Sequence, residues 1–510
     1  MLSKVKTATV QGIEGQMITV ETDISPGLPG FYLVGQADTA IKEAKDRIRA
    51  ALGNSGCEYP RTRITVNMSP AGIRKRGSHF DLALAIGILA SSGQIRDDKL
   101  QEYCFIGELS LDGTLSRTDG ILPMIITMRN NGIENIIIPS ANEEEGALVN
   151  DINIYVADCI EQIVNHLNYD AELKKIRGDE NLYNERKIKY NVDFSDVKGQ
   201  ETAKRAITIC VAGGHGLFMM GSPSSGKTML AERIPTIMPP MKYEEILEST
   251  VIYSISGLLD KENPIIDVRP FRHPHNRITQ AAFIGGGVYP KPGEISLAHK
   301  GVLFLDEFGE FDRGVIENLR QPLEKKEIIL NRKELSCIYP ADFLLVAASN
   351  PCRCGYYGDE THNCKCTMSQ VLNYQHKLSG PIMDRIDMNL FLTPVGYAEL
   401  EDEKNTSSEI MRKRVMRARK IQEERFRNEA ISLNSEMDGN LLDLYVPIDS
   451  PEIKKFLSEA YTRLKLNPRT MQKVRKIART IADLDGAEEV KIEHFAESLA
   501  YRGEASWLEY

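Results

Sequence analysis

A glycine-rich segment that ends in lysine and threonine carries the clearest chemistry in the chain. It follows the apolar run Leu217–Met220. The spacing G-x-x-x-x-G-K-[ST] lets backbone N–H groups turn inward around phosphates, brings the lysine to the terminal phosphates and offers a hydroxyl to Mg²⁺. A helix beginning here directs its positive end at the same phosphates. We therefore predict that ATP and Mg²⁺ bind here, with contacts from Gly221, Ser222, Pro223, Ser224, Ser225, Gly226, Lys227 and Thr228.

Two adjacent acidic residues follow a later apolar run. The run Gly301–Leu305 ends in Asp306 and Glu307. We expect Asp306 to hold the Mg²⁺ shell and Glu307 to orient the water that attacks the γ-phosphate. The alternative is an ordinary buried strand with solvated acids at its end. The complete phosphate-binding loop upstream disfavours that alternative.

An amide and an arginine extend the same pattern. The apolar run Phe343–Ser349 ends in Asn350, which we expect to hydrogen-bond the γ-phosphate or the attacking water. Further on, Arg385 stands between Asp384 and Asp387. A guanidinium that reaches the γ-phosphate of a neighbouring copy would neutralise charge in the transition state. A structural ion pair with one of the flanking acids is the alternative for Arg385.

Four cysteines form two C-x-C pairs around a polar loop. Four thiolates can close a tetrahedral Zn²⁺ site, and a loop with so few apolar residues needs such a crosslink. Reduced free thiols are the alternative, and His362 could replace one cysteine as a ligand. The predicted zinc ligands are Cys352, Cys354, Cys364 and Cys366. The other cysteines stand singly in apolar surroundings and are expected in cores: Cys57, Cys104, Cys159, Cys210 and Cys337.

The bulk properties indicate a multidomain globular protein. The chain has 510 residues, of which 42% are hydrophobic and 26% charged, and this length favours about three domains. The net charge of −9 excludes a general electrostatic attraction to nucleic acid, so such binding would need local basic patches. No apolar run approaches the ~18 residues of a membrane span, and the first residues lack a signal-peptide pattern. We therefore expect a cytoplasmic protein.

The pattern of periodicities divides the chain into four parts. Residues 1–166 alternate strand-like and helical runs, residues 167–192 form a polar linker, residues 193–394 hold the chemistry above, and residues 395–510 are helical. We predict an α/β fold, with a parallel sheet between helices as its core, an α+β domain in front and a helical lid behind.

The front part resembles the proteolytic domain of Lon, in the segments Gly107–Gly113, Gly120–Pro123 and Asn135–Pro139. That family cuts peptides with a serine activated by a lysine. Here His79 falls at the position of the nucleophile, Ser78 one position early, and Leu122 where the lysine belongs. The resemblance therefore implies a Lon-like fold without peptidase activity. We expect Ser78 to act as a helix N-cap and His79 to be partly exposed.

The phosphate-binding loop is followed by the acidic strand end, the strand end with Asn350, and Arg385 between its acids. This order resembles that of AAA+ ATPases of the helix-2-insert branch. Their finer resemblance, over nearly the whole chain, is to the magnesium-chelatase-like ATPases of the ComM/YifB family. Asn276 and Arg277 stand where that family has histidine and threonine, and Arg353 replaces a proline. The resemblance is carried by the segments Arg269–Arg272, Gly285–Gly287, Pro292–Glu307 and Leu319–Glu324.

The resemblance implies further roles for particular residues. Asn350 matches sensor 1 and Arg385 the arginine finger. Val197 and Gly199 border the adenine ring, and Arg469 matches the sensor-2 arginine, acting on its own nucleotide or on a neighbour's. Arg475 and Arg479 are the competing assignments for sensor 2.

If copies of the chain form a ring, two elements would face its pore. The loop Gly285–Tyr289 offers Tyr289 for stacking on a base, and a hairpin turn carries Arg332 and Lys333 as phosphate contacts. A simple loop and solvated basic residues are the alternatives. The resemblance implies a homohexameric DNA motor, a helicase or branch-migration factor in homologous recombination and natural transformation. A magnesium-chelatase-type or protein-remodelling ATPase that drives a partner protein is the alternative, and a protease is disfavoured.

Overall fold

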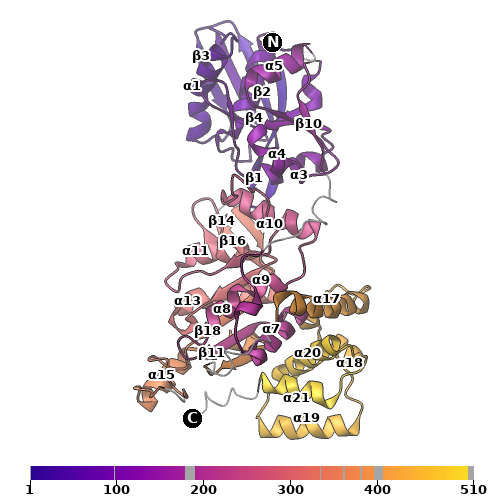
Figure 1. Ribbon diagram of the computed structural model, residues 1–510. Coiled ribbons are helices and arrows are strands. Elements are labelled where there is room, and N and C mark those ends of the chain that lie inside the picture. Colours follow the sequence, from indigo (N-terminus) through magenta and orange to yellow (C-terminus); the bar gives the residue numbers. More distant parts are fainter. Residues whose placement is uncertain are drawn as a thin grey trace.

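The computed structural model describes residues 2–96, 98–169, 171–178, 190–332, 335–359, 362–378, 382–394 and 406–502. An N-terminal sheet with its helices lies at one end of the molecule, followed by a core built on a parallel sheet and then by a group of helices (Figure 1). The predicted α/β class, with a parallel sheet and a helical C-terminal part, is confirmed.

A mixed eight-stranded sheet organises the N-terminal part. Its order is β10-β9-β8-β5-β1-β2-β4-β3, and the long antiparallel pair β1 and β2 runs through its middle. The strands are β1 (Leu2–Gln11), β2 (Glu14–Ser25), β3 (Gly30–Val34), β4 (Arg63–Ser69), β5 (Tyr103–Phe105), β8 (Asn135–Pro139), β9 (Asn153–Ala157) and β10 (Lys174–Ile176). A separate pair, β6 (Glu108–Leu109) and β7 (Leu115–Ser116), forms a short hairpin around Asp112 and Gly113.

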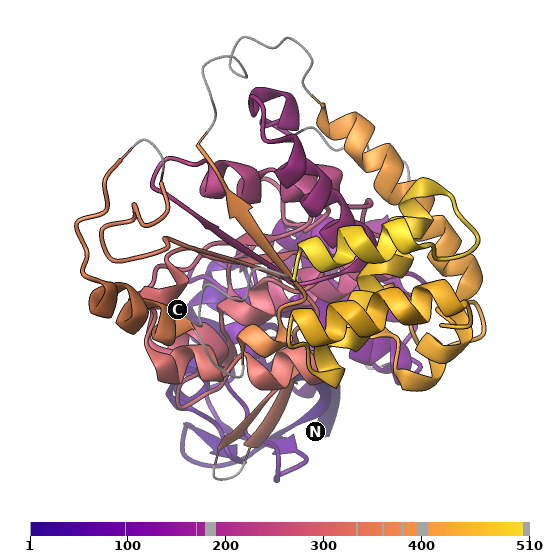
Figure 2. The same ribbon diagram turned by 90° about the horizontal axis from the view of Figure 1, so that it is seen from below.

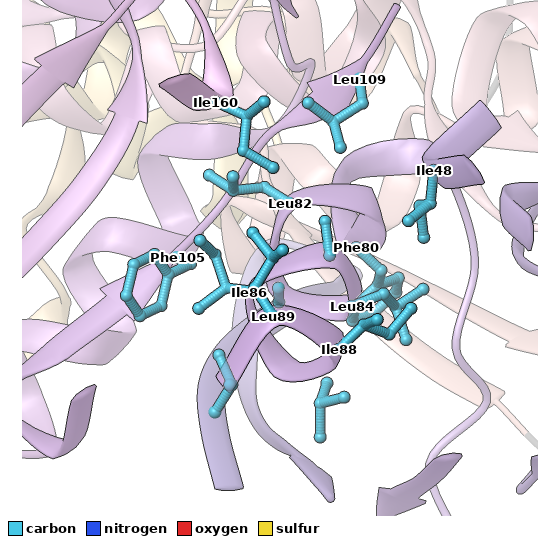
Figure 3. Close-up of a cluster of buried hydrophobic side chains, with 14 of the residues drawn as sticks. Ile48, Phe80, Leu82, Leu84, Ile86, Ile88, Leu89, Phe105, Leu109 and Ile160 are labelled. Carbon is cyan, nitrogen blue, oxygen red and sulfur yellow. The ribbon is translucent and has the colours of Figure 1, made fainter. Parts of the chain in front are cut away.

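Helix α2 (Asp81–Ser91) is the centre of the N-terminal core, because all of its residues are buried. A helix that is apolar on every side needs neighbours on every side. Each of its large apolar side chains contributes about 1.5–3 kcal/mol by burial. Figure 3 shows side chains of this cluster, among them Ile48, Phe80, Leu82, Leu84, Ile86, Ile88, Leu89, Phe105, Leu109 and Ile160. The other helices of this part are α1 (Thr39–Asn54), α3 (Ile121–Asn130), α4 (Glu143–Gly146) and α5 (Ile160–Tyr169).

The polar segment after residue 166 is not a linker throughout. Helix α5 continues to Tyr169, and β10 adds to the edge of the sheet by pairing antiparallel with β9. An edge strand needs only backbone hydrogen bonds on one side, so its polar side chains can stay in water. The sequence pattern was therefore read as a linker where the structure has a strand. Residues 179–189 of the expected linker lie outside the described part.

The core is a five-stranded parallel sheet in the order β12-β15-β18-β11-β19. Its strands are β11 (Leu217–Gly221), β12 (Phe271–Arg272), β15 (Val302–Leu305), β18 (Leu344–Ser349) and β19 (Met388–Leu392). Around it lie α7 (Glu201–Gly213), α8 (Lys227–Glu232), α9 (Ile234–Ile237), α10 (Tyr243–Ser256), α13 (Arg313–Glu317), α14 (Arg320–Lys325) and α15 (Met368–Leu378). An insert comprises α11 (Gln280–Ile284), β13 (Gly285–Gly286), β14 (Lys291–Pro292) and α12 (Glu294–Leu297), and a hairpin comprises β16 (Glu327–Arg332) and β17 (Leu335–Pro340).

The C-terminal helices pack against one flank of the core. They are α17 (Ser408–Arg425), α18 (Gly439–Tyr445), α19 (Pro451–Arg463), α20 (Pro468–Asp485) and α21 (Ile492–Ala500). Helix α20 begins with Pro468 after the N-cap Asn467, and proline is favoured at the first position of a helix. Apolar side chains of α17 and α20 join the core of α7 and the sheet. Figure 2 shows these helices on one side of the sheet and α15 on the other.

The N-terminal part and the parallel-sheet core share an apolar interior. Side chains of α3 lie in one buried cluster with Ile246 and Val251 of α10. Polar contacts border this cluster: the Gly120 N–H donates to the Ser254 carbonyl at 3.1 Å, and the Ser254 hydroxyl donates to Glu145. These contacts attach the N-terminal sheet to the insert side of the core, at the opposite end of the molecule from the C-terminal helices (Figure 1).

Candidate nucleotide-binding site and cysteine cluster

The phosphate-binding loop has the backbone that its glycines require. Gly226 has φ +88°, and α8 begins at the next residue, Lys227. Ser224 also has a positive φ, +65°. A side chain at Gly221 would lie 2.7 Å from the Ser225 Oγ and 2.8 Å from a backbone carbonyl of β19. The loop therefore turns tightly between the end of β11 and the start of α8, where backbone N–H groups can surround an anion.

Lys227 links this loop to the strand that ends in Asn350. Its Nζ donates to the Gly221 carbonyl at 2.8 Å, to the Ser222 carbonyl at 2.9 Å and to Asn350 Oδ1 at 3.2 Å. Burial lowers the pKa of the Lys227 ammonium, while Asp306 acts to raise it. The structure thus brings together the predicted phosphate-binding cation and the predicted sensor amide.

The two expected Mg²⁺ ligands lie in direct contact. The Thr228 hydroxyl donates to Asp306 Oδ2 at 2.8 Å. Asp306 follows β15, which pairs with β18 in the sheet, so the ends of neighbouring parallel strands meet at one edge. A hydroxyl and a carboxylate oxygen are suitable donors for Mg²⁺, which keeps several of its waters. The residues present therefore fit Mg²⁺ beside a bound triphosphate.

Glu307 is held by a residue that sequence reasoning did not assign. Glu307 has a left-handed backbone, φ +52°, and its Oε2 accepts a hydrogen bond of 2.7 Å from Asn276 Nδ2. Sequence comparison noted Asn276 only as a departure from the family pattern. This hydrogen bond uses one of the acceptor positions with which the carboxylate could orient a water.

The expected adenine-binding segment lies at the same edge of the sheet. Gln200 Nε2 donates to the Thr393 carbonyl at 2.8 Å, just beyond the end of β19. Val197 is buried in the core, whereas Gly199 is half-buried and has φ +60°. Of the two predicted contacts, Gly199 is therefore the better placed to meet a ligand.

Arg385 lies at the opposite edge of the same sheet. It belongs to a short 3-10 helix, Met383–Arg385, and the Asp387 N–H two residues later donates to the carbonyl of Gly216, directly before β11. Because β11 and β19 are parallel, about five residues or ~17 Å of strand separate this edge from the phosphate-binding loop. Arg385 therefore cannot reach a nucleotide in its own loop.

Arg385 does form an ion pair, with a partner that the sequence did not indicate. Its Nε donates to Glu324 Oε1 at 3.1 Å. Asp387 instead lies 3.2 Å from Lys473 Nζ and 3.7 Å from His215 Nδ1. Although burial acts to raise it, the pKa of Asp387 is held well below its usual range by His215 and Lys473, and burial lowers the pKa of Lys473 to about 8.

Arg469 lies with Arg385 and away from the phosphate-binding loop. Both line a groove of about 1850 Å³ between the amino edge of the sheet and the C-terminal helices. The competing candidates are engaged elsewhere. Arg475 donates to Asp443 and to carbonyls of the α18 region, and Arg479 is buried against Asp483. Among the three arginines, Arg469 is the one that lines the groove beside Arg385.

The four cysteines of the C-x-C pairs converge. The Sγ atoms of Cys352, Cys354 and Cys364 lie 3.4–3.7 Å apart, and all four sulfurs, with that of Cys366, lie within 4.8 Å of one another. Zinc–thiolate bonds of about 2.3 Å in a tetrahedron separate sulfurs by roughly 3.8 Å. The cluster therefore fits Zn²⁺. His362 stacks on Tyr356 and is outside this group.

The remaining cysteines only partly match their expected burial. Cys104, Cys210 and Cys337 are buried, whereas Cys57 and Cys159 are half-buried. The apolar neighbours of the latter two in sequence do not enclose their side chains completely.

The N-terminal part holds no serine–lysine pair at the predicted positions. Leu122 is fully buried in α3 where the lysine would stand. Ser78 is not an N-cap, because it lies inside a short 3-10 helix that follows Gly77, and its hydroxyl donates to Glu108. His79 is half-buried, as expected, and burial lowers the pKa of its imidazole to about 4. A peptidase dyad therefore gains no support here.

The structure describes two of the three candidate DNA contacts, Tyr289 and Arg332. Tyr289 is 42% exposed, and the Arg76 guanidinium of the N-terminal part lies over its ring at 2.8 Å from the centroid. Arg332 ends β16 and pairs through its backbone with Leu335. Lys333 lies outside the described residues. Tyr289 thus already contacts a cation on one face.

The helices of the described residues are either too short or too polar to traverse a lipid bilayer.

Three family models match the chain. One, described as subunit ChlI of Mg-chelatase, matches residues 20–142. A second, described as magnesium chelatase, subunit ChlI, matches residues 193–400, and a third, for the ChlI C-terminal region, matches residues 405–502. The second match contains the phosphate-binding loop, both strand-end acids and the cysteine cluster.

Relatives cover nearly the whole chain. It is 38% identical over 509 residues to competence protein ComM of Haemophilus influenzae, spanning 98% of this chain and 97% of ComM. It is 40% identical over 503 residues to YifB of Escherichia coli, with the shares again 98% and 97%. The magnesium-chelatase 67 kDa subunit of Chlorobaculum parvum is 25% identical over 163 residues, 31% of this chain and 23% of that protein. The chain therefore belongs to the ComM/YifB family of magnesium-chelatase-like AAA+ ATPases.

Proposed function

We propose that the protein is an ATP-hydrolysing ring motor that acts on DNA, as a helicase or branch-migration factor in homologous recombination and natural transformation. The observation that carries the proposal is the separation of the site's two halves. Lys227, Asp306 and Glu307 lie at the carboxyl edge of the sheet, whereas Arg385 and Arg469 lie at the amino edge.

Identical copies placed head to tail bring these two edges together. A head-to-tail contact of this kind closes into a ring when the rotation from one copy to the next divides a full turn into equal parts. In that arrangement Arg385 and Arg469 of one copy meet the nucleotide held by the next, so Arg469 acts on a neighbour's nucleotide. A ring of six copies follows from the family resemblance. Hydrolysis then requires two copies, which makes ATP turnover a signal between neighbours.

Each residue at the carboxyl edge has a defined task in this scheme. Lys227 and the loop N–H groups bind the phosphates, and Thr228 and Asp306 would hold Mg²⁺, which supplies charge neutralisation when bound. Glu307 turns from Asn276 to orient the attacking water. Arg385 of the adjoining copy stabilises the charge that develops on the transferred phosphoryl group.

The choice of DNA as the substrate has separate support. One relative is named for competence, the state in which cells take up DNA. Tyr289 offers an exposed ring beside arginines, a combination suited to stacking on bases. Together with Tyr289, Arg332 and Lys333 are the proposed DNA contacts.

The test is ATP hydrolysis with and without DNA, together with strand displacement on forked and plain substrates. We expect DNA to stimulate hydrolysis and Lys333→Ala to lower that stimulation while leaving hydrolysis without DNA nearly intact. A protein that hydrolyses ATP equally with and without DNA, and displaces no strand, would refute the DNA motor.

A partner-driving ATPase of the magnesium-chelatase type, or one that remodels proteins, is the second candidate. The similarity to the 67 kDa magnesium-chelatase subunit favours it. Stimulation by a protein partner and not by DNA would identify this function. A peptidase is disfavoured, because Leu122 stands where the activating lysine belongs.

We also propose that the four-cysteine cluster holds a structural Zn²⁺. Its sulfur separations fit a tetrahedral thiolate site. Elemental analysis of the purified protein tests this, and we expect about one zinc per chain.

A further inference from the structure

The cysteine cluster is continuous with the nucleotide site along the chain. Asn350, which contacts Lys227, is separated from Cys352 by a single buried proline. Cys352 is itself fully buried. The first ligand of the cluster therefore lies within two residues of a side chain that reaches the phosphate-binding loop.

The loop between the cysteine pairs also rests directly on the phosphate-binding loop. A Cβ atom added to Gly355 would lie 2.6 Å from Pro223 Cγ and 2.7 Å from its Cδ. These distances are shorter than van der Waals contact, so the backbone at residue 355 lies this close to the Pro223 ring only because residue 355 has no side chain. Gly355 also has φ +89°, which favours glycine. The contact joins the two loops side by side.

Little besides the sulfurs holds the cysteine loop in this position. Most of its described side chains are exposed or half-buried. Its inner end is fixed by Gln375 of α15, whose Nε2 donates to the Pro351 carbonyl at 3.2 Å, and by the Cys352–Gly355 backbone hydrogen bond of 3.0 Å. A polar loop of this kind cannot order itself by burial, so a metal crosslink supplies the missing constraint.

We propose that a thiophilic divalent metal in this cluster is a positioning element of the nucleotide site. The inference rests on the proposed ATPase function and extends it. With the metal bound, the loop is pressed against Pro223 and the backbone on either side of Pro351 is fixed. The Asn350 side chain is then held in a fixed position relative to the phosphate-binding loop. Without the metal both lose this support, and ATP is bound and hydrolysed less well.

The first experiment removes a ligand. Cys364→Ser is compared with Cys159→Ser, which changes a half-buried cysteine outside the cluster. Metal content is measured by elemental analysis, the thiolate environment by the absorption of the Co²⁺-substituted protein, and ATP affinity by titration with a fluorescent ATP analogue. We expect Cys364→Ser to lose the metal and to bind ATP about tenfold more weakly, since outer supporting groups change affinity by such factors. Cys159→Ser should match the parent protein.

The second experiment keeps all four thiolates and breaks only the contact between the loops. Gly355→Ala adds a methyl group against Pro223, whereas Gly358→Ala adds one where nothing lies within 4 Å. Both glycines have positive φ, +89° and +78°, so the backbone strain is similar and the contact is the difference. We expect both variants to retain the metal. Gly355→Ala should lower kcat/KM for ATP about tenfold, because a misplacement of ~1 Å can cost up to about 10²-fold and the added methyl group requires a smaller shift.

The outcomes separate the inference from the function on which it rests. Equal kcat/KM in Gly355→Ala and Gly358→Ala, or unchanged ATP affinity in metal-free protein, would overturn the positioning role. If Cys364→Ser does not fold, the glycine pair still decides. Should the parent protein neither bind nor hydrolyse ATP, the proposed function fails instead.

Discussion

The two edges of the parallel sheet differ in how complete they are. At the carboxyl edge, Lys227 contacts Asn350 and Thr228 contacts Asp306, so this half of the site is assembled within one copy. At the amino edge, Arg385 pairs with Glu324 beside a groove that also contains Arg469. Under the proposed function, one edge of the sheet binds the nucleotide, and the other edge supplies catalytic charge to the nucleotide of a neighbouring copy.

Lys227→Ala is expected to have the largest effect, because it removes the central cation of the carboxyl edge. ATP binding should be lost, and hydrolysis with it. Binding is measured with a fluorescent ATP analogue, and the exposed Lys261→Ala serves as the control. ATP binding that survives in Lys227→Ala would show that the carboxyl edge is not the nucleotide site.

Arg385→Ala tests whether the amino edge acts on a neighbouring copy. The variant should bind ATP normally and hydrolyse it about 10³-fold more slowly. Mixing it with Lys227→Ala should restore part of the activity, because each variant then supplies the half that the other lacks. Hydrolysis is measured across mixing ratios.

Glu324→Gln distinguishes this role from a structural ion pair. It breaks the contact with Arg385 within one copy but leaves the guanidinium in place, so hydrolysis should change little. An equal loss in Arg385→Ala and Glu324→Gln, with no recovery on mixing, would mean that the pair serves only the fold.

Glu307→Gln separates binding from chemistry at the carboxyl edge. The variant should bind ATP with nearly the parent affinity and hydrolyse it about 10²-fold more slowly, since general-base contributions begin at this size. Affinity and single-turnover hydrolysis are measured on the same preparation. A parallel loss of both quantities would contradict the role assigned to the carboxylate.

Asn276→Ala should have a smaller effect on hydrolysis than Glu307→Gln, and of opposite sign. Without the amide at 2.7 Å, Glu307 is released, and we expect hydrolysis without DNA to rise about threefold, as loss of one hydrogen bond of ordinary net strength allows. The exposed neighbour Arg277→Ala is the control. Slower hydrolysis in Asn276→Ala would indicate that this contact supports Glu307 instead of restraining it.

The sequence predicts the residues of the carboxyl edge well, because each group of them forms a short contiguous motif. A glycine-rich loop, an acidic strand end and an asparagine strand end are each read from a few adjacent residues, and parallel pairing then brings their ends together. The parallel sheet itself follows from the same apolar runs. The four cysteines were found through their spacing, although the spacing did not decide the place of His362.

What the sequence does not predict are contacts between side chains far apart along the chain. Asn276 and Glu307 are 31 residues apart, and Arg385 and Glu324 are 61 apart. No periodicity encodes such pairs, because they depend on how the insert and the helices fold over the sheet. Strand β10 was missed for another reason: its place in the sheet depends on backbone hydrogen bonds, which polar composition conceals.

The apolar interior shared by α3 and α10 has a mechanical consequence. A joint sealed by packed aliphatic groups resists bending, whereas a wet, polar joint lets domains swing. The N-terminal sheet is therefore attached rigidly to the parallel-sheet core. Under the proposed function, a rotation of the core during ATP turnover would displace the far end of the N-terminal sheet by the same rotation.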